Sequence, residues 1–338
     1  MNITTLGIDL AKDVFQLHGI DKEGKVVLKK KLTRTKLSKF IATLPKCLIG
    51  MEACGGANYW ARKFQSFGHE VKLMGPQFVK PYVKGNKNDN NDSEAICEAV
   101  TRPNMRFVPI KKIEQQDIQS LHRIRSNLIQ SRTAAVNQLR GLLAEYGIVI
   151  PKQVQNVRNH IPAILEDAEN ELSLFMRTEF QKLYDNIVAL DKNIEESDKL
   201  IKNIFNNNEQ CKRIAEIEGV GFLTATAIVA AIADPKLFKS GRELSAWLGL
   251  VPRQHSSGGS QRLLGISKRG DKYLRTLLIH GARSVVCRVE NKEDARSMWI
   301  KNIKKQRGMN KACVALANKN ARIIWALLSK NETYKKAA

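Results

Sequence analysis

The amino-acid sequence predicts an α/β domain at the N-terminus followed by an all-α, mainly helical remainder. Three observations lead to this fold class. Residues 1–108 alternate short apolar runs with helical stretches, residues 109–208 lose every strand signal and become helically periodic, and residues 209–330 are helical stretches broken by glycine turns. We therefore expect three successive regions with these bounds and a frayed tail over residues 331–338.

The N-terminal elements follow one another in an informative order. Short apolar runs in "ITTLGIDLA" and "DVFQLHGID" predict two strands, and the alternating "KVVLKKKL" after the turn residues "KEG" predicts a third. A helix over 36–44, a buried strand in "CLIGMEA", a helix in "NYWARKFQSFG", a strand in "EVKLM" and a helix that starts in "DNNDSEAICEAVTR" complete the series. The first three strands form a meander, so the sheet is mixed. This is also the element order of the RNase H-like fold.

Two helical seams mark the middle region. The apolar residues of the first seam recur at intervals of three or four residues, and arginines occupy the positions that are skipped. The apolar residues are Ile118, Leu121, Leu128, Ala135, Leu139 and Leu142. After the breaker "GIVIPK", a second seam keeps a-and-d spacing and is interrupted at Ser197: Leu183, Ile187, Leu190, Ile194, Ile201 and Ile204. This spacing predicts a coiled coil. It fits two long helices packed within one chain as well as a coiled coil that joins subunits.

The C-terminal region opens with a helix, a Gly-x-Gly turn and a second helix in "IAEIEGVGFLTATAIVAAI". This form is typical of a helix-hairpin-helix element. Such a turn exposes backbone N–H groups at a helix N-terminus, where they hold a phosphate without reading sequence. We therefore expect this element to contact nucleic acid.

Charge points to a polyanionic partner. The net charge is +23 and the isoelectric point is near 9.8. The last 98 residues hold 21 Lys and Arg against 6 Asp and Glu, so the excess is concentrated there. Such a field favours nucleic acid or an anionic membrane surface as the partner, and a merely solubilising surface is the plainer alternative.

The cysteines and the apolar runs limit the classes of protein to which this chain can belong. The six cysteines are scattered without a C-x-x-C pair, which indicates reduced thiols and disfavours a zinc module. The longest apolar run, Ala225 to Ala233, is about half of a membrane span, and no signal-peptide pattern opens the chain. We expect a soluble, cytoplasmic protein.

Four acids stand out in this basic chain. Asp9 interrupts the first apolar strand near its C-terminal end, and Glu52 holds the equivalent place on the fourth. Asp89 and Asp92 lie three residues apart at a helix start and share a face, although helix capping is the commoner role of Asp there. In an RNase H-like sheet the first and fourth strands are neighbours. The four carboxylates would then converge and bind Mg²⁺, as one ion or two, with Mn²⁺ as an expected substitute.

Five stretches of the chain resemble a known family. "GIDLAK", "GMEACGG", "KNDNNDSEA", "GLVPRQHSSGG" and "GISKRGDKYLRTLL" resemble the DEDD transposases of the insertion sequence one-ten family, which includes the Piv-like DNA invertases. The resemblance runs from Gly7 to about Leu328. It implies a RuvC-like, RNase H-type catalytic domain, a helical coiled-coil region, and a C-terminal transposase domain with a nucleophilic serine. Family members similarly work with a structured RNA from the element, which pairs with donor and target DNA.

The resemblance also assigns residues. The family's four acids fall on Asp9, Glu52, Asp89 and Asp92, and its serine falls on Ser257. Two positions depart from the usual acid motif, with Asn88 in place of Thr and Ser93 in place of Ala. Neither change alters a ligand. The neighbouring Ser256 is a competitor for the nucleophile.

The serine stretch, "PRQHSSGGSQRLLGISKRGDKYLR", lacks the acid of a Ser-His-acid triad. A serine hydroxyl can attack phosphorus and form a phosphoserine bond, and the glycines let the DNA backbone approach. Cations around it are expected to bind nucleic acid: Arg253, Arg262, Lys268, Arg269 and Arg275. We also assign His255 to phosphate or RNA binding, with a general base as its alternative role.

The function predicted from these features is an RNA-guided DNA transposase or recombinase that forms a phosphoserine intermediate. One alternative is a RuvC-like, metal-dependent nuclease or Holliday-junction resolvase without a covalent intermediate. A non-catalytic nucleic-acid-binding protein is a second, which the presence of all four acids disfavours. The expected partners are donor DNA, target DNA and a guide RNA. We expect a homo-oligomer, either a dimer or a tetramer.

Overall fold

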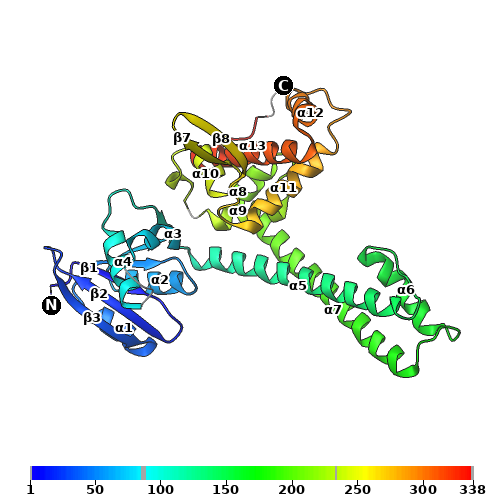
Figure 1. Cartoon of the computed structure of the whole chain (residues 1–338), viewed down its shortest axis with the longest axis horizontal. Coiled ribbons are helices and arrows are strands. Elements are labelled where there is room, and N and C mark those ends of the chain that lie inside the picture. The colour runs from blue at the N-terminus through cyan, green and yellow to red at the C-terminus, as the bar shows by residue number, and fades with distance from the viewer. Residues whose placement is uncertain (1, 85–88, 233, 336–338) are drawn as a thin grey trace. The chain divides into compact units, whose positions relative to one another are not determined.

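The computed structural model describes residues 2–84, 89–232 and 234–335, with residues 89 and 90 described by their backbone only (Figure 1). Two compact units make up the chain. The first is Met1–Lys112 and the second is Ile113–Ala338. Each is described by itself below.

The first unit is built on a six-stranded mixed sheet with strand order β3-β2-β1-β4-β5-β6. Its strands are β1 (Thr5–Asp9), β2 (Val14–Ile20), β3 (Val26–Thr33), β4 (Leu48–Glu52), β5 (Glu70–Met74) and β6 (Phe107–Val108). The first three strands pair antiparallel, whereas β1, β4 and β5 run parallel. The predicted α/β class and the mixed sheet are confirmed. The short β6 pairs antiparallel with β5 and was not predicted.

Helices cover both faces of this sheet. On one face, α1 (Arg34–Thr43) and α2 (Ala57–Ser66) bury their apolar sides against alternate strand residues, including Ile8 and Ile49. On the other face, α4 (Asp89–Val100) packs against β1, β2 and β4. Two short helical turns, α3 (Pro76–Val79) and η1 (Lys80–Tyr82), precede α4.

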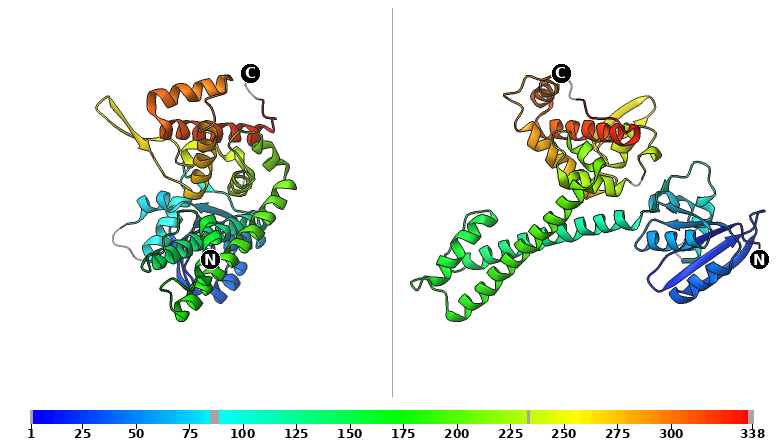
Figure 2. Two further views of the ribbon diagram at one scale, coloured as in Figure 1. Left: turned by 90° about the vertical axis from the view of Figure 1, so that its right-hand side faces the viewer. Right: turned by 180° about the vertical axis from the view of Figure 1, so that it is seen from behind.

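The second unit begins with a pair of long helices. In the chain, α5 (Ile113–Ala144) and α7 (Leu174–Asn206) run in opposite directions, with α6 (Val154–Glu166) between them in sequence and packed on both (Figures 1 and 2). Three residues of the predicted second seam, Ile187, Ile194 and Ile201, are buried. The seam therefore packs within one chain. A coiled coil that joins subunits stays a prediction.

Ion pairs explain the arginines in the first seam. Arg132 on α5 donates to Asp191 on α7 at 2.9 Å, and Arg158 on α6 donates to the other oxygen of that carboxylate at 2.8 Å. Arg125 on α5 donates to Asp198 on α7. The arginines are tolerated at the contact between the helices because each one pairs with a carboxylate there.

The rest of the second unit is a helical core with one hairpin. Its helices are α8 (Glu209–Ala215), α9 (Phe222–Ala231), η2 (Pro235–Leu237), α10 (Gly241–Trp247), α11 (Lys272–Val286), α12 (Ala295–Arg307) and α13 (Met309–Lys330). Between α10 and α11, strands β7 (Pro252–Ser257) and β8 (Ser260–Ile266) form a two-stranded hairpin, drawn in yellow in Figure 2. Our reading of this region as helical missed the hairpin. Its signal was the Gly-Gly pair, a common two-residue hairpin turn.

The turn between α8 and α9 packs by its backbone on α11. Gly219 has a φ of 87°, and a Cβ on Gly281 would lie 1.8 Å from the Gly219 carbonyl oxygen. Only glycines permit this approach. Two helices, α8 and α9, flank this turn as expected, whereas the helix-hairpin-helix assignment and its use in phosphate binding stay predictions.

Two side-chain contacts hold residues that follow α13 against the second unit. Arg213 donates to Asn331, and Arg296 donates to the Tyr334 hydroxyl at 3.0 Å. The expected tail over residues 331–338 stays a prediction, and residues 336–338 lie outside the described part of the chain. Among the described residues, no helix has the length and apolarity to cross a membrane.

Candidate active site

Two of the predicted acids end neighbouring parallel strands. Ile8 of β1 lies opposite Met51 of β4, so the next residues, Asp9 and Glu52, come at the same end of the sheet. Both side chains are half-buried. The carboxyl ends of parallel strands are a common place for polar ligands, because the strand backbone positions each side chain.

Glycines on the same two strands allow α4 to lie against them. A Cβ on Gly7 would lie 2.3 Å from the Ser93 carbonyl oxygen, and a Cβ on Gly50 would lie 2.8 Å from the Val100 Cβ. Strand residues two apart point to the same face, so Asp9 and Glu52 project on the α4 side of the sheet. The first turns of α4 come to this end, because Ser93 is the residue that touches Gly7.

Electrostatics places Asp92 with these two acids. Burial raises the pKa of Glu52, and the charges of Asp9 and Asp92 raise it further. Like charges have this effect only when they lie near the carboxyl group. The charge of Asp92 therefore reaches Glu52, while the grouping of the predicted acids into one site stays a prediction. Asp92 lies inside α4, past its capping position, so capping is not its role.

The fourth acid, Asp89, is the first residue of α4, and its side chain lies outside the described part of the chain. Within the described residues, no three His, Cys, Asp or Glu side chains are grouped closely enough to hold a metal ion. The predicted metal site thus stays a prediction. The donor set itself fits, because gathered carboxylates that raise one another's pKa suit a hard divalent cation.

One neighbour of the acids escaped the sequence analysis. Burial raises the pKa of Cys54, and the charges of Glu52 and Asp9 raise it further, so its thiol is neutral at physiological pH. We had treated Cys54 as one of six scattered thiols. Its position two residues after Glu52, directly behind a strand end, was the signal for this placement.

Ser257 is the last residue of β7 and directly precedes the hairpin turn. Gly258 and Gly259 have φ values of 54° and 80°, which fits a type I′ turn between Ser257 and Ser260. A Cβ on either glycine would have no atom within 4 Å. The turn is therefore open on its outside, and all of β7 is exposed.

The hairpin register separates the two serines. Ser257 lies opposite Ser260 and His255 opposite Arg262, so these side chains share one face of the hairpin. Ser256 points to the other face, where its Oγ accepts a hydrogen bond of 2.7 Å from the Gln254 Nε2. The sequence alone did not distinguish these environments.

The remaining predicted cations divide into exposed and buried ones. Arg253, Lys268 and Arg269 are exposed, the last two on the loop between β8 and α11. Arg275 is only 9% exposed, and its Nη1 donates to the carbonyl oxygens of Leu248 at 3.1 Å and Arg269 at 3.4 Å. We had grouped Arg275 with the nucleic-acid contacts. Its guanidinium instead supports the loop that carries the exposed cations.

Comparisons with known proteins find two transposase family models that match the chain. A transposase family model of the DEDD IS110 type matches residues 6–148, which include all four acids. A second model, for the transposase IS116/IS110/IS902 family, matches residues 211–298, which include Ser257.

Full-length relatives extend the match over the whole chain. A probable family 20 transposase of Pseudomonas aeruginosa is 48% identical, with 99% of each chain covered. The transposase for insertion sequence element IS1111A of Coxiella burnetii is 49% identical, with 99% of this chain and 92% of the relative covered. The pilin gene-inverting protein of Moraxella bovis is 28% identical over 61% of this chain and 69% of its own length. The chain therefore belongs to the IS110 family of insertion-sequence transposases.

Proposed function

We propose that this transposase cuts and rejoins DNA through the carboxylates of Asp9, Glu52, Asp89 and Asp92 together with the hydroxyl of Ser257, and that a guide RNA selects the DNA. The observation that supports the carboxylate part of this proposal is the register of β1 and β4, which end at Asp9 and Glu52 on the side of the sheet where α4 packs. The position of Ser257 beside an open glycine turn supports its proposed role as the nucleophile.

The four carboxylates would hold a divalent metal ion, with Mg²⁺ as the proposed metal. When bound, the ion neutralises their repulsion and polarises a phosphate oxygen. The sheet and α4 contribute rigid positioning, since two acids are fixed by strand register and Asp92 by the packing of α4 on Gly7. Precise placement of this kind is a large part of phosphoryl-transfer catalysis.

In the proposed covalent step, the Ser257 Oγ forms a bond to phosphorus and the bond from phosphorus to the leaving deoxyribose oxygen breaks. The Oγ proton passes to a base or to water, and the leaving oxygen takes up a proton. Rejoining reverses these changes with the hydroxyl of another strand. Arg262 and His255 share the face of Ser257 and are proposed to hold the phosphate.

The guide RNA and the oligomeric state are the remaining parts of the proposal. A net charge of +23, with a large excess after residue 240, supports binding of more than one nucleic-acid strand. Base pairing then supplies the sequence choice. We propose a dimer or a tetramer, because strand exchange needs several cuts held together.

The test is to trap the covalent intermediate. On a nicked suicide DNA substrate with Mg²⁺ and the element's RNA, the wild-type protein is expected to form an adduct that survives denaturation, with the phosphodiester on Ser257 by mass spectrometry of the digest. Ser257→Ala should lose the adduct and the recombined product while binding nucleic acid normally. Ser256→Ala is the matched control and should retain most of both, because Ser256 faces away from His255 and Arg262.

Two results would contradict the proposal. Cleavage that continues in Ser257→Ala without any adduct would establish a metal-dependent nuclease instead. An adduct found on Ser256 would move the nucleophile by one residue and to the opposite face of the hairpin.

A further inference from the structure

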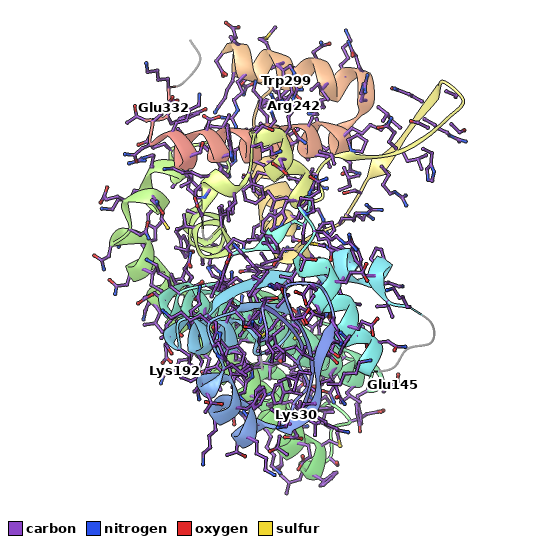
Figure 3. All side chains as sticks on the ribbon, turned by 90° about the vertical axis from the view of Figure 1, so that its left-hand side faces the viewer. Lys30, Glu145, Lys192, Arg242, Trp299 and Glu332 are labelled. Atoms are coloured by element: carbon purple, nitrogen blue, oxygen red, sulfur yellow. The ribbon has the colours of Figure 1, made fainter. Side chains whose placement is uncertain are left out.

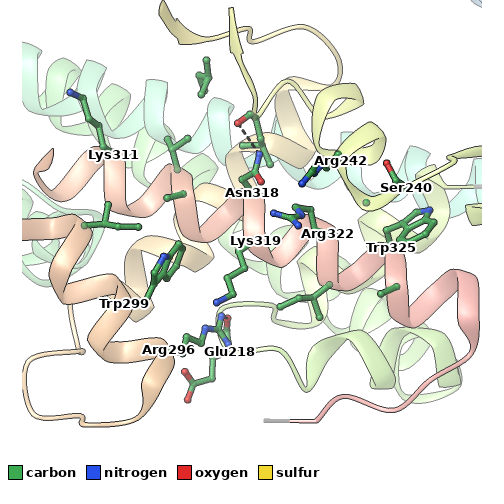
Figure 4. A pocket seen from close by; sticks show the side chains of 18 of the residues that line it. Glu218, Ser240, Arg242, Arg296, Trp299, Lys311, Asn318, Lys319, Arg322 and Trp325 are labelled. Carbon is green, nitrogen blue, oxygen red and sulfur yellow. Dashed lines mark hydrogen bonds between the residues drawn. The ribbon is translucent and has the colours of Figure 1, made fainter. Parts of the chain in front are cut away.

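A large groove crosses the second unit, away from the serine turn. Its volume is about 2640 Å³, and it is bordered by α10, α12, α13, the residues that follow α13 and the base of the β7–β8 hairpin (Figure 4). Sites for small molecules measure roughly 300–1,000 Å³. The groove is therefore of a size for a segment of a polymer, and nothing in the predicted transposition chemistry uses it.

Among the charged residues that line the groove, eight are cationic and three are acidic. Arg242, Arg307, Lys311 and Arg322 line it and are exposed. Within the described part of the chain, none of these four side chains makes a hydrogen bond or an ion pair. A Cβ on Gly241 would lie 2.9 Å from the Arg322 Cα, so α10 approaches α13 closely and brings Arg242 beside Arg322 (Figure 4).

The acids at the groove are already engaged. Glu218 pairs with Lys292 at 3.2 Å, Asp294 accepts from the Ser297 backbone N–H at 3.0 Å, and Glu332 lies 3.9 Å from Lys330. The arginines and Lys311 thus keep their positive charge for a ligand. Charge complementarity favours a polyanion.

An aromatic ring lies among these cations. Trp299 of α12 is half-buried in the groove, and the Lys319 Nζ lies 4.5 Å from its ring centroid (Figures 3 and 4). Amide side chains from Gln306, Asn310 and Asn318 also line the groove. Duplexes present phosphates outward and keep their bases stacked inside. Single strands offer bases for aromatic stacking, and RNA adds a 2′-hydroxyl that amides recognise.

We propose that this groove binds a single-stranded segment of RNA, with phosphates on Arg242, Arg322 and Lys311 and a base stacked at Trp299. The inference deepens the proposed guide-RNA function and rests on it. It assigns the RNA a binding site on the second unit that adjoins the base of the serine hairpin but does not include Ser257.

The experiment measures binding of a fluorescent 20-nucleotide oligouridine to the full-length protein over a range of salt concentrations. Arg242→Ala/Arg322→Ala should bind at least tenfold more weakly, and its log–log salt slope should be shallower by about 1.4, since each single-strand phosphate contact contributes about 0.7. Trp299→Leu should bind roughly tenfold more weakly with an unchanged slope, and Trp299→Phe should recover most of the loss because the ring is retained.

Lys199→Ala/Lys202→Ala on α7 is the matched control, because it also removes two exposed cations from the second unit. It should stay within twofold of wild type. Equal losses in this control and in the groove variant would overturn the proposal, as would a groove variant that binds oligouridine normally. A larger loss for duplex RNA or for oligothymidine than for oligouridine would overturn the assignment to single-stranded RNA.

Circular dichroism and the melting temperature show whether each variant is folded, and Arg242 and Arg322 are exposed enough to be replaced without loss of core packing. The adduct assay on Ser257 separates this inference from the proposed function. If wild type forms the adduct while groove variants bind RNA normally, only the groove inference fails. If groove variants lose RNA while wild type forms no adduct, only the catalytic proposal fails.

Discussion

At the scale of single residues, the acids at the end of the sheet are held against their own repulsion. Glu52 is half-buried beside Asp9 and Asp92, and both the burial and the charges raise its pKa. Without a cation this arrangement costs free energy, because desolvated like charges are not neutralised. Repulsion of this kind would be relieved by the divalent cation that we propose.

Replacement of one acid tests this directly. Asp9→Asn keeps the shape of the side chain and removes its charge, so we expect strand cleavage to fall at least a hundredfold while DNA and RNA binding stay within a few-fold of wild type. Cleavage of a labelled substrate in Mg²⁺ and a filter-binding assay measure the two. Full cleavage by Asp9→Asn would exclude a metal-binding role for this residue.

A buried histidine gives the second unit a pH dependence. His122 is 3% exposed, and its ring contacts the Tyr273 hydroxyl and the Thr226 hydroxyl at 3.0 Å each. Burial first, and the charge of Arg125 second, lower its pKa from 6.5 to about 4. The unfolded chain therefore takes up a proton below pH 6.5, while the folded chain does so only near pH 4. Stability is complete above pH 6.5 and is lost as the pH falls through this window.

We expect the free energy of unfolding of wild type to drop by about 2 kcal/mol more between pH 7 and pH 5 than that of His122→Gln, since each pH unit in the window is worth about 1.4 kcal/mol. Urea unfolding at the two pH values measures this. His160→Gln is the control, because His160 is exposed on α6 and its ring bonds only a backbone carbonyl. Identical pH dependence in all three proteins would show that His122 does not carry the effect.

At the scale of elements, α4 matters for the site because it sets where Asp92 lies. The helix approaches the sheet at two glycines, and the backbone of Ser93 occupies the space where a Gly7 side chain would be. The position of α4 thus depends on the absence of a side chain at Gly7. A change far from any charged atom should therefore disturb the acids.

Gly7→Ala is expected to cost about 1–3 kcal/mol in stability and to reduce cleavage at least tenfold, because the new Cβ would lie 2.3 Å from a backbone oxygen and must push α4 away. Gly141→Ala on α5 is the control, since a Cβ there meets no atom within 4 Å. Thermal unfolding and the cleavage assay measure the two effects. A fully active and stable Gly7→Ala protein would show that the position of α4 is not critical.

At the scale of the whole molecule, the charge that gives affinity for nucleic acid is separate from the property that selects a DNA sequence. The chain carries a net charge of +23, and its most basic stretch is the second half of the second unit. Phosphate contacts of this kind give affinity without sequence preference. The choice of a DNA site must then come from another source, which we propose to be base pairing with RNA.

We expect the binding of duplex DNA to weaken steeply with salt, with a log–log slope of about −0.9 for each neutralised phosphate. Purified protein that is free of RNA should bind target and scrambled duplexes alike, and the addition of the element's RNA should restore the preference. Competition binding with the two duplexes measures this. Selection of the target by protein that contains no RNA would contradict the guided mechanism.

Local sequence determined much of the first unit and of its acids. A carboxylate inside an apolar strand, as at Asp9 and Glu52, costs free energy. The strand order of an RNase H-like sheet then predicts that the two acids are neighbours. The alternation of apolar runs and turn residues likewise predicted the meander and the parallel strands, because these signals lie within a few residues of one another.

Contacts between residues far apart in the sequence determined the features of the second unit that the sequence did not predict. Arg275 is buried because the carbonyls of Leu248 and Arg269 come to it, and α5 packs on α7 within one chain through pairs such as Arg132 and Asp191. Ser256 and Ser257 face opposite sides because β7 pairs with β8, and the groove collects cations from residue 242 to residue 322. Side chains so far apart in sequence carry no local signal of one another. Only packing in three dimensions brings them together.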